Sequence, residues 1–262
     1  MRVHVVSDVH GNAEALARAG DGADALLVLG DLVDFVDYQH PERGILGRVL
    51  GPGVSSRFGW LRTHGRPGEL SEFAKREWDR IPDPRAVVAE AVRAQYTELF
   101  AAMTAPTWAI PGNVDLVALW PEFARDGVVL ADRRVVSIGG LRFGFVGGVP
   151  LLPGVQPRDD GPWVPNMVLR TEYDAAVAAL GELDVLCSHA PPAVPDLCYD
   201  TVTRRGEYSS QALLERIRRD QPRAALFGHV HQPLARRARI GRTECVNAGH
   251  FRRTGAPYVL RY

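Results

Sequence analysis

Residues 1–34 read MRVHVVSDVHGNAEALARAGDGADALLVLGDLVD. Two short apolar runs in this stretch each lead into an aspartate, Asp8 and Asp31. Between the runs, Asn12 is a suitable N-cap for a helix over about residues 12–19. A strand, a helix and a second strand in this order form a βαβ unit, whose strands are parallel. The stretch therefore predicts an α/β fold with polar residues at the carboxyl ends of its strands.

Three later apolar runs also lead into polar residues. These are Asn113, which has an amide side chain, and His189 and His229, which have imidazoles. In open α/β sheets, ligands bind beyond the carboxyl ends of the strands, so these residues are expected to converge on one rim. Together they are too many for one tetrahedral site, and a carboxylate such as Asp31 can bridge two cations. One such residue alone is better explained as a helix cap or a core histidine, but for the whole set these explanations would require repeated coincidence. The predicted ligands of a dinuclear metal centre are Asp8, His10, Asp31, Asn113, His189, His229 and His231.

The motifs that contain these residues also resemble those of a known family. In chain order they are Asp8-Val9-His10, Gly30-Asp31-Leu32-Val33-Asp34, Gly112-Asn113, His189 and Gly228-His229-Val230-His231. This ordered set resembles the blocks of calcineurin-like metallophosphoesterases, from residue 3 to about residue 250. The resemblance implies a β-sandwich of two mixed sheets flanked by helices, within the α/β class. It also implies that one metal ion binds Asp8, His10, Asp31 and His231, and that a second binds Asp31, Asn113, His189 and His229.

The implied activity is metal-dependent hydrolysis of a phosphoester. Two divalent cations that share Asp31 are expected to lower the pKa of a bridging water, so that hydroxide attacks the phosphorus in line. Manganese, iron, zinc and nickel all suit these ligands. The expected partner is a small-molecule phosphate ester, for which a nucleotide is one candidate. Asn113 is expected to contact the phosphate as well as the metal.

Position 114 departs from the commonest pattern of the family, in which a histidine there contacts the phosphate and helps to protonate the leaving group. Val114 can do neither. Family branches without this histidine are commonly associated with phosphodiesters, so phosphodiesters are favoured over monoesters. His250 is a candidate for the missing acid, although a loop histidine without a catalytic role explains it equally well. Asp115 is expected to cap a helix over residues 116–124.

Two other functions compete with hydrolysis. The first is a non-enzymatic metal-binding scaffold or protein-interaction module of the same fold, against which the intact ligand set argues. The second is a nuclease, suggested by Arg236, Arg237, Arg239 and the basic residues of 216–219. The 31 basic and 31 acidic residues balance, so a nucleic-acid partner is not expected.

The 262 residues are enough for one large domain, and no shift in composition divides them. We expect a single domain, residues 1–262, with an insertion of helices and loops at about 38–106 that could act as a lid. Within it, residues 40–68 are rich in Gly and Pro and predict an irregular loop, followed by a helix at 71–79.

The chain enters a strand at once and has no run of membrane-spanning length, which favours a cytoplasmic protein without a membrane partner. The three cysteines form no metal-binding or redox pair, and the sequence does not predict an oligomeric state.

Asp83 and Pro84 suit the cap and first position of a further helix, whose apolar stripe is expected to pack in the core. Gly139-Gly140 predicts a hairpin within a second sheet. Residues 149–165 contain five prolines and predict a loop. The other expected strands are 2–7, 25–29, 108–110, 128–130, 134–138, 141–146, 185–187, 224–227, 233–240, 242–247 and 258–262, and the other expected helices are 171–180 and 209–219.

Overall fold

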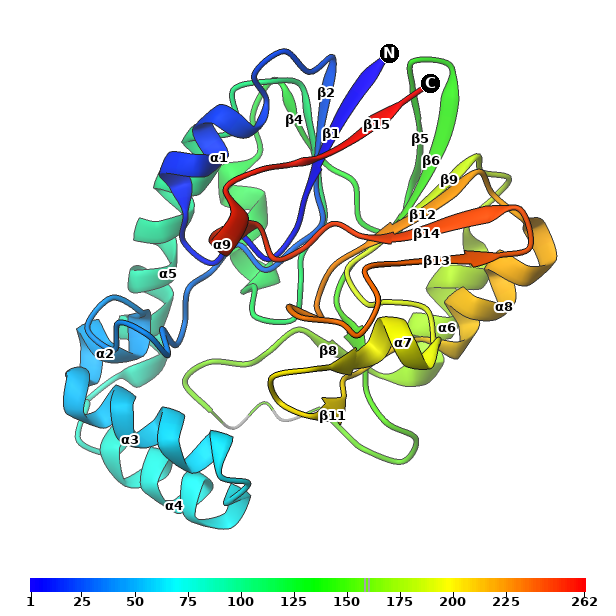
Figure 1. Cartoon of the computed structure of the whole chain (residues 1–262). Helices are drawn as coiled ribbons and strands as arrows, with labels where there is room; N and C mark the ends of the chain where they lie inside the picture. The colour runs from blue at the N-terminus through cyan, green and yellow to red at the C-terminus, as the bar shows by residue number, and fades with distance from the viewer. Residues whose placement is uncertain (158, 160) are drawn as a thin grey trace.

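Two β-sheets lie face to face in the computed structural model, which describes residues 1–157, 159 and 161–262 (Figure 1). The first has the strand order β15 (Tyr258–Arg261), β1 (Arg2–Val6), β2 (Ala25–Val28), β3 (Thr107–Ala109) and β4 (Val128–Leu130). The second has the order β13 (Arg237–Ile240), β14 (Thr243–Asn247), β12 (Ala224–Phe227), β9 (Val185–Ser188), β6 (Leu141–Val146) and β5 (Val135–Ile138).

Both sheets are mixed. Strands β1 to β4 are parallel to their neighbours, and β15 runs antiparallel to β1 at the edge. In the second sheet, β6, β9, β12 and β14 are parallel, while β5 and β13 are antiparallel edges. The predicted sandwich of two mixed sheets is confirmed, and so is the hairpin at Gly139-Gly140. Two further ribbons pair β7 (Val149–Pro150) with β8 (Met167–Val168) and β10 (Tyr199–Asp200) with β11 (Arg205–Gly206).

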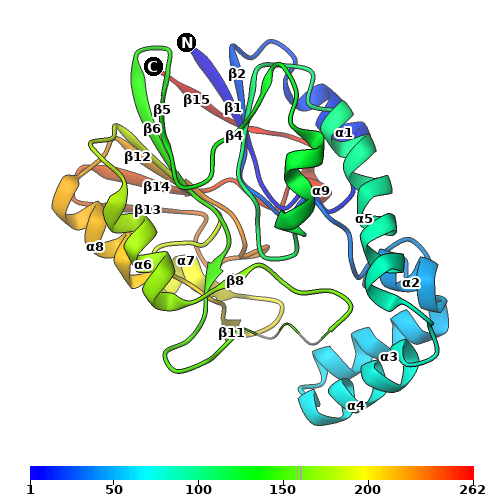
Figure 2. The ribbon, with the colours of Figure 1, turned by 180° about the vertical axis from the view of Figure 1, so that it is seen from behind.

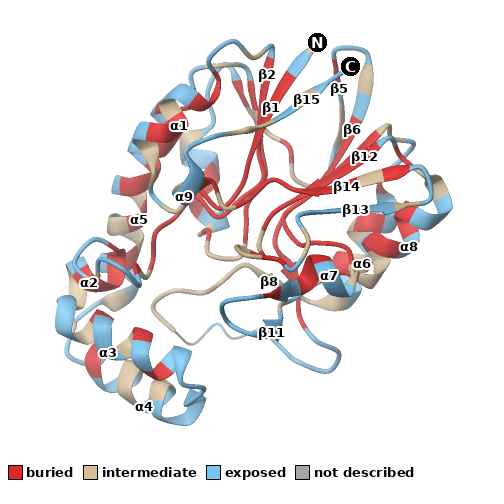
Figure 3. Ribbon diagram, viewed as in Figure 1, coloured by how far each residue is buried: buried red, intermediate tan, exposed pale blue. Residues whose placement is uncertain are grey.

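Helices cover the outer face of each sheet (Figure 2). On the first sheet lie α1 (Ala13–Ala19) and α5 (Pro84–Ala101), and on the second lie α6 (Arg170–Ala179) and α8 (Gln211–Asp220). The buried residues form one apolar layer between the sheets and one under each set of helices (Figure 3). Leu27 and Phe143 belong to the layer between the sheets, where burial of apolar surface stabilises the sandwich.

The segment between β2 and β3 is helical, and the prediction of an irregular loop at 40–68 is wrong. It forms α2 (Ile45–Leu50), α3 (Pro52–Thr63), α4 (Pro67–Trp78) and then α5. Its prolines mark helix starts, since Pro52 and Pro67 occupy the first helical positions of α3 and α4, where a missing N–H costs nothing. Gly51 between α2 and α3 has a φ of 92°, which favours glycine. The pair α3 and α4 projects from the body of the molecule (Figure 1).

Most other predicted elements are confirmed within one to four residues, and three details are corrected. Helix α5 begins at Pro84 with the Asp83 side chain as its cap, and most of its apolar stripe is buried, but Val87 is exposed. Residues 149 and 150 form β7 instead of loop, and of the loop predicted over 149–165, residues 158 and 160 lie outside the described residues. Residues 117–123 form a 3-10 helix, η1 (Val117–Phe123), instead of an α-helix.

Two short helices were not predicted, α7 (Pro195–Cys198) and α9 (Phe251–Thr254). Of the helices in the described part of the chain, none combines the length and the apolar composition that a membrane span requires.

Candidate metal centre

The seven predicted ligands follow five strands whose carboxyl ends meet between the two sheets. Asp8, Asp31 and Asn113 come from β1, β2 and β3 of the first sheet, and the three later histidines follow β9 and β12 of the second. Four of the seven adopt a left-handed backbone: Asp8, His10, Asp31 and His229 have φ values of 59°, 41°, 55° and 68°. This conformation costs energy for residues other than glycine, and such strain is concentrated at functional sites.

Two loops of the first sheet touch directly beneath these ligands. A Cβ atom at Gly112 would collide with the backbone and carboxylate of Asp31, so only glycine allows this approach. The Val114 N–H donates a hydrogen bond to Asp31 Oδ1 over 2.9 Å. The glycine of the Gly-Asn motif therefore serves to bring the β2 and β3 loops together.

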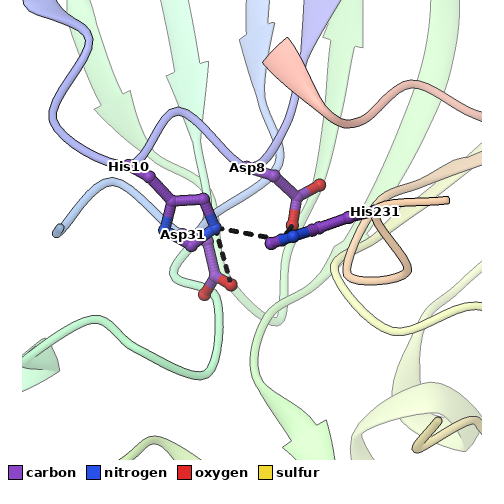
Figure 4. A group of neighbouring side chains, drawn as sticks. All are labelled: Asp8, His10, Asp31 and His231. Carbon is purple, nitrogen blue, oxygen red and sulfur yellow. Dashed lines mark hydrogen bonds and ion pairs between the residues drawn. The ribbon is translucent and has the colours of Figure 1, made fainter. Parts of the chain in front are cut away.

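One group of ligand atoms comprises Asp8, His10, Asp31 and His231 (Figure 4). Their ligand atoms all lie within 4.8 Å of one another. His10 Nε2 is 3.1 Å from His231 Nε2 and 3.8 Å from Asp31 Oδ2, and His231 Nε2 is 3.5 Å from Asp8 Oδ1. Imidazole nitrogens this close, beside two carboxylates, can share one divalent cation.

A second group comprises Asp31, His189 and His229. His189 Nε2 is 3.4 Å from Asp31 Oδ1 and 3.1 Å from Asn113 Oδ1. The Nε2 atom of His229 is buried and has no hydrogen-bond partner among the described residues. A buried polar atom without a partner is costly, and a metal ion would satisfy it. The two groups meet at Asp31, whose Oδ2 faces His10 and whose Oδ1 faces His189.

Backbone carbonyls set the orientation of two imidazoles. His10 Nδ1 is 3.1 Å from the carbonyl oxygen of Val33, and His189 Nδ1 is 2.8 Å from that of Leu29. Because a carbonyl only accepts hydrogen bonds, each Nδ1 carries the proton. When its ring is neutral, each histidine therefore presents the lone pair of Nε2 to the cluster, which is the arrangement of a metal-ligating histidine.

Burial and mutual attraction shift the protonation of the cluster. Burial raises the pKa of both Asp8 and Asp31, but nearby histidines have a larger effect in the opposite direction. The pKa of Asp8 therefore lies well below its ordinary value, and that of Asp31 falls to about 2. Burial, together with the charge of His189, lowers the pKa of His229 to about 3. Burial also lowers the pKa of His189, but Asp31 outweighs it and raises the value to about 9. Anionic carboxylates and a neutral His229 suit a cation, whose binding would displace the proton from His189.

Asp115 does not cap η1, and that prediction is wrong. Its Oδ1 accepts hydrogen bonds from the N–H groups of Leu32 and Val33, and its Oδ2 accepts one from that of Gly112. The buried Tyr96 hydroxyl of α5 also donates to it. Burial raises the pKa of Asp115 to about 6, with the charge of Asp31 adding to the effect. Asp115 thus ties the β2 and β3 loops, which carry Asp31 and Asn113, to each other.

His250 lies over the first ligand group. Its ring stacks on that of His231 with centroids 4.1 Å apart and meets the His10 ring edge-on at 6.1 Å. Its Nδ1 is buried without a hydrogen-bond partner among the described residues. Two further histidines belong to the insertion: His64 is exposed and stacks on Trp60, and His40 lies on the segment before α2.

Two residues that sequence reasoning missed, Asp37 and Asn166, support the site. Asp37 and Asp34 both pair with Arg252, whose Nη1 is 2.8 Å from Asp34 Oδ1 and whose Nη2 bonds Asp37. The only signal was the recurrence of aspartate in the segment after Asp31. Asn166 holds the β3 loop, since its side chain donates to the Gly112 carbonyl and its N–H to the Asn113 carbonyl. No signal in the sequence singles out Asn166.

The comparisons with known proteins agree with this arrangement. A family model described as calcineurin-like phosphoesterase matches residues 1–233. Among solved structures, the crystal structure of TT1561 of Thermus thermophilus is 12% identical, with a TM-score of 0.54, and the match covers 99% of this chain and 97% of that one. At this identity the likeness shows the fold alone.

GAP50, the anchor in the inner membrane complex of Plasmodium, is 9% identical, with a TM-score of 0.40 and coverage of 95% of this chain and 71% of that one. No match was found among the curated proteins. Because the family model covers nearly the whole chain and the structure gathers a buried Asp/His cluster typical of a dimetal site, the chain belongs to the calcineurin-like phosphoesterase family.

Proposed function

We propose that this protein is a dinuclear metal-dependent phosphoesterase that favours phosphodiesters. The observation that carries the proposal is the position of Asp31, whose two carboxylate oxygens face different histidines. A carboxylate placed in this way can bridge two cations. We further propose that residues 1–262 act as one domain, with residues 38–106 as its insertion.

The proposed ligand sets share Asp31 and use every residue of the two clusters. The first site takes Asp8, His10, Asp31 and His231, and the second takes Asp31, Asn113, His189 and His229. Manganese, iron, zinc and nickel fit imidazole and carboxylate ligands. When bound, the two cations supply Lewis-acid activation of the phosphoester and of the attacking water.

Asn113 is proposed to contact the substrate as well. Its Oδ1 points at His189 Nε2, 3.1 Å away, so its amide nitrogen is left to donate to a phosphate oxygen. A neutral donor would then orient the phosphoryl group. Compared with a cation, a neutral donor discriminates less between the monoanion of a diester and the dianion of a monoester. Val114 adds no charge to hold the further negative charge of a monoester. Neither residue therefore supplies the charge that would favour a monoester.

We propose His250 as the group that protonates the leaving oxygen. It stacks on His231, and its Nδ1 has no partner among the described residues. A general acid must reach the leaving group directly or through one water, and the proposed ligand sets leave the His250 imidazole free beside the first site. Burial lowers the pKa of His250 to about 3, so the proposal requires the anionic substrate to raise this pKa when it binds.

The test is hydrolysis of bis(4-nitrophenyl) phosphate and 4-nitrophenyl phosphate by the manganese-loaded protein. We expect a higher kcat/KM for the diester. A strong preference for the monoester would contradict the substrate preference while leaving the metal centre intact. Weakly held, sub-stoichiometric metal together with no hydrolysis of either substrate would instead support a non-enzymatic scaffold.

A further inference from the structure

A cavity of about 400 Å³ opens beside the first metal site. His10, one of the proposed ligands, forms part of its wall. The opposite wall comes from the segment before α2, from α2 itself and from α5. Any substrate whose phosphoryl group lies at the metal centre can therefore extend directly into this cavity.

The lining is strongly polar and carries three arginines, Arg43, Arg48 and Arg252. Arg252 is already paired with Asp34 and Asp37. Among the described residues, none forms a salt bridge with Arg48, and Arg43 reaches only its exposed neighbour Glu42, at 3.8 Å. Two guanidinium groups are thus available to a ligand.

The segment that carries these arginines is anchored to the residues that follow Asp31. The N–H of Ile45 donates to the Asp34 carbonyl, and that of Leu46 donates to the Phe35 carbonyl. Helix α2 therefore begins at a fixed distance from the loop that contains Asp31. The Asp37 carboxylate accepts hydrogen bonds from the N–H groups of Gln39 and His40 and pairs with Arg252, which holds the chain before Arg43. Arginines on a fixed backbone lose less conformational freedom when they bind an anion.

The lining also restricts what the ligand can be. Leu99 is the only large apolar side chain among the described lining residues, and none of them is Phe, Tyr or Trp. An acyl chain or a stacked base would find little to pack against. Glu98 adds one acid to the wall, where it can accept a hydrogen bond from a hydroxyl group. Guanidinium groups bind phosphate and carboxylate oxygens through paired hydrogen bonds.

We propose that this cavity binds a second anionic group of the substrate through Arg43 and Arg48. The substrate would then be a small polar phosphoester that carries a further phosphate or carboxylate group. This inference rests on the proposed function, because it places the reacting phosphoryl group at the metal centre.

Isothermal titration calorimetry of the manganese-loaded full chain tests the inference without relying on turnover. The probes are alkane bisphosphonates of increasing chain length and the alkyl monophosphonates of equal length, which cannot be hydrolysed. We expect one bisphosphonate to bind about 10- to 100-fold more tightly than its monophosphonate, as charge-assisted hydrogen bonds allow. An ω-carboxyalkyl phosphonate of that length shows whether phosphate or carboxylate is preferred.

The variants make the test specific. In the double variant Arg43→Gln/Arg48→Gln, the ratio of the affinity for the bisphosphonate to that for the monophosphonate should fall to near one. In the matched control Arg62→Gln, which changes an exposed arginine of α3 outside the cavity, the ratio should be retained. A ratio near one in the unchanged protein for every length, or a ratio that survives the double substitution, would overturn the inference. Absence of diester hydrolysis alongside the expected ratios would refute the proposed function and leave the anion site standing.

Discussion

The backbone N–H of Val114 donates a hydrogen bond to Oδ1 of Asp31 over 2.9 Å. The residue at the position where the family commonly has a histidine thus holds the shared carboxylate through its backbone. This contact does not depend on the side chain. The structural role of position 114 is therefore separable from the chemical role that a histidine would have there.

This separation predicts the result of Val114→His. The substitution should keep the backbone contact and add an imidazole that can protonate the leaving group. We expect kcat/KM for an alkyl phosphate monoester to rise by about tenfold or more. The gain for 4-nitrophenyl phosphate should be smaller, because nitrophenolate leaves without a proton. Val114→Ala is the control that adds no acid, and equal gains on both substrates would argue against this role.

A second prediction concerns the shared ligand. Asp31→Ala should abolish turnover, because it removes a ligand from both sites. The bound metal should fall from the expected two ions per chain to less than the His229→Ala variant retains. His229→Ala removes a ligand from one site and should leave about one tightly held ion. Metal content after dialysis, measured by mass spectrometry, distinguishes the two variants. His64→Ala changes an exposed histidine of the insertion and should retain metal and activity. Full activity in either ligand variant would refute the proposed centre.

The grouping of the proposed ligands could be predicted from the sequence because each member follows a short apolar run. That rule places residues as distant as Asp8 and His231 at one rim, and the distances between their side chains agree with it. The role of Asp115 could not be predicted in this way. Its hydrogen bond with Leu32 spans 83 positions of the chain, whereas a helix cap is a local contact, and local reasoning always favours the local partner.

The helical structure of residues 40–68 could not be predicted for a different reason. Gly and Pro mark loops and helix boundaries alike, so a segment with Gly51, Pro52 and Pro67 reads as a loop until the helices between them are seen. The same segment carries Arg43 and Arg48, whose position beside the metal centre depends on that helical structure.

Arg252 is predicted to stabilise the fold by joining the end of the chain to the segment after β2. Its partners Asp34 and Asp37 are buried, and Arg252→Gln would leave both carboxylates without their cation. We expect a loss of about 1–3 kcal/mol in the free energy of unfolding, measured by urea denaturation. Arg253→Gln changes the exposed neighbour and should cost less than about 0.5 kcal/mol. Equal stability of the two variants would contradict the role of the Arg252 pairs.

The last prediction concerns pH and Asp132, a residue outside the two proposed ligand sets. Burial raises the pKa of Asp132 above its ordinary value, even though its carboxylate accepts a hydrogen bond of 2.6 Å from the Gly147 N–H. A carboxyl group whose pKa is raised in the folded state destabilises the fold at pH values above that pKa, where it must be ionised. Asp132→Asn keeps an acceptor for Gly147 and removes the charge. The variant should therefore be more stable than the unchanged protein at pH 7, and this advantage should vanish as the pH falls below the ordinary carboxyl pKa of 3.8. Urea denaturation of both proteins across this range measures the difference, and an advantage that grows toward low pH would have the wrong sign.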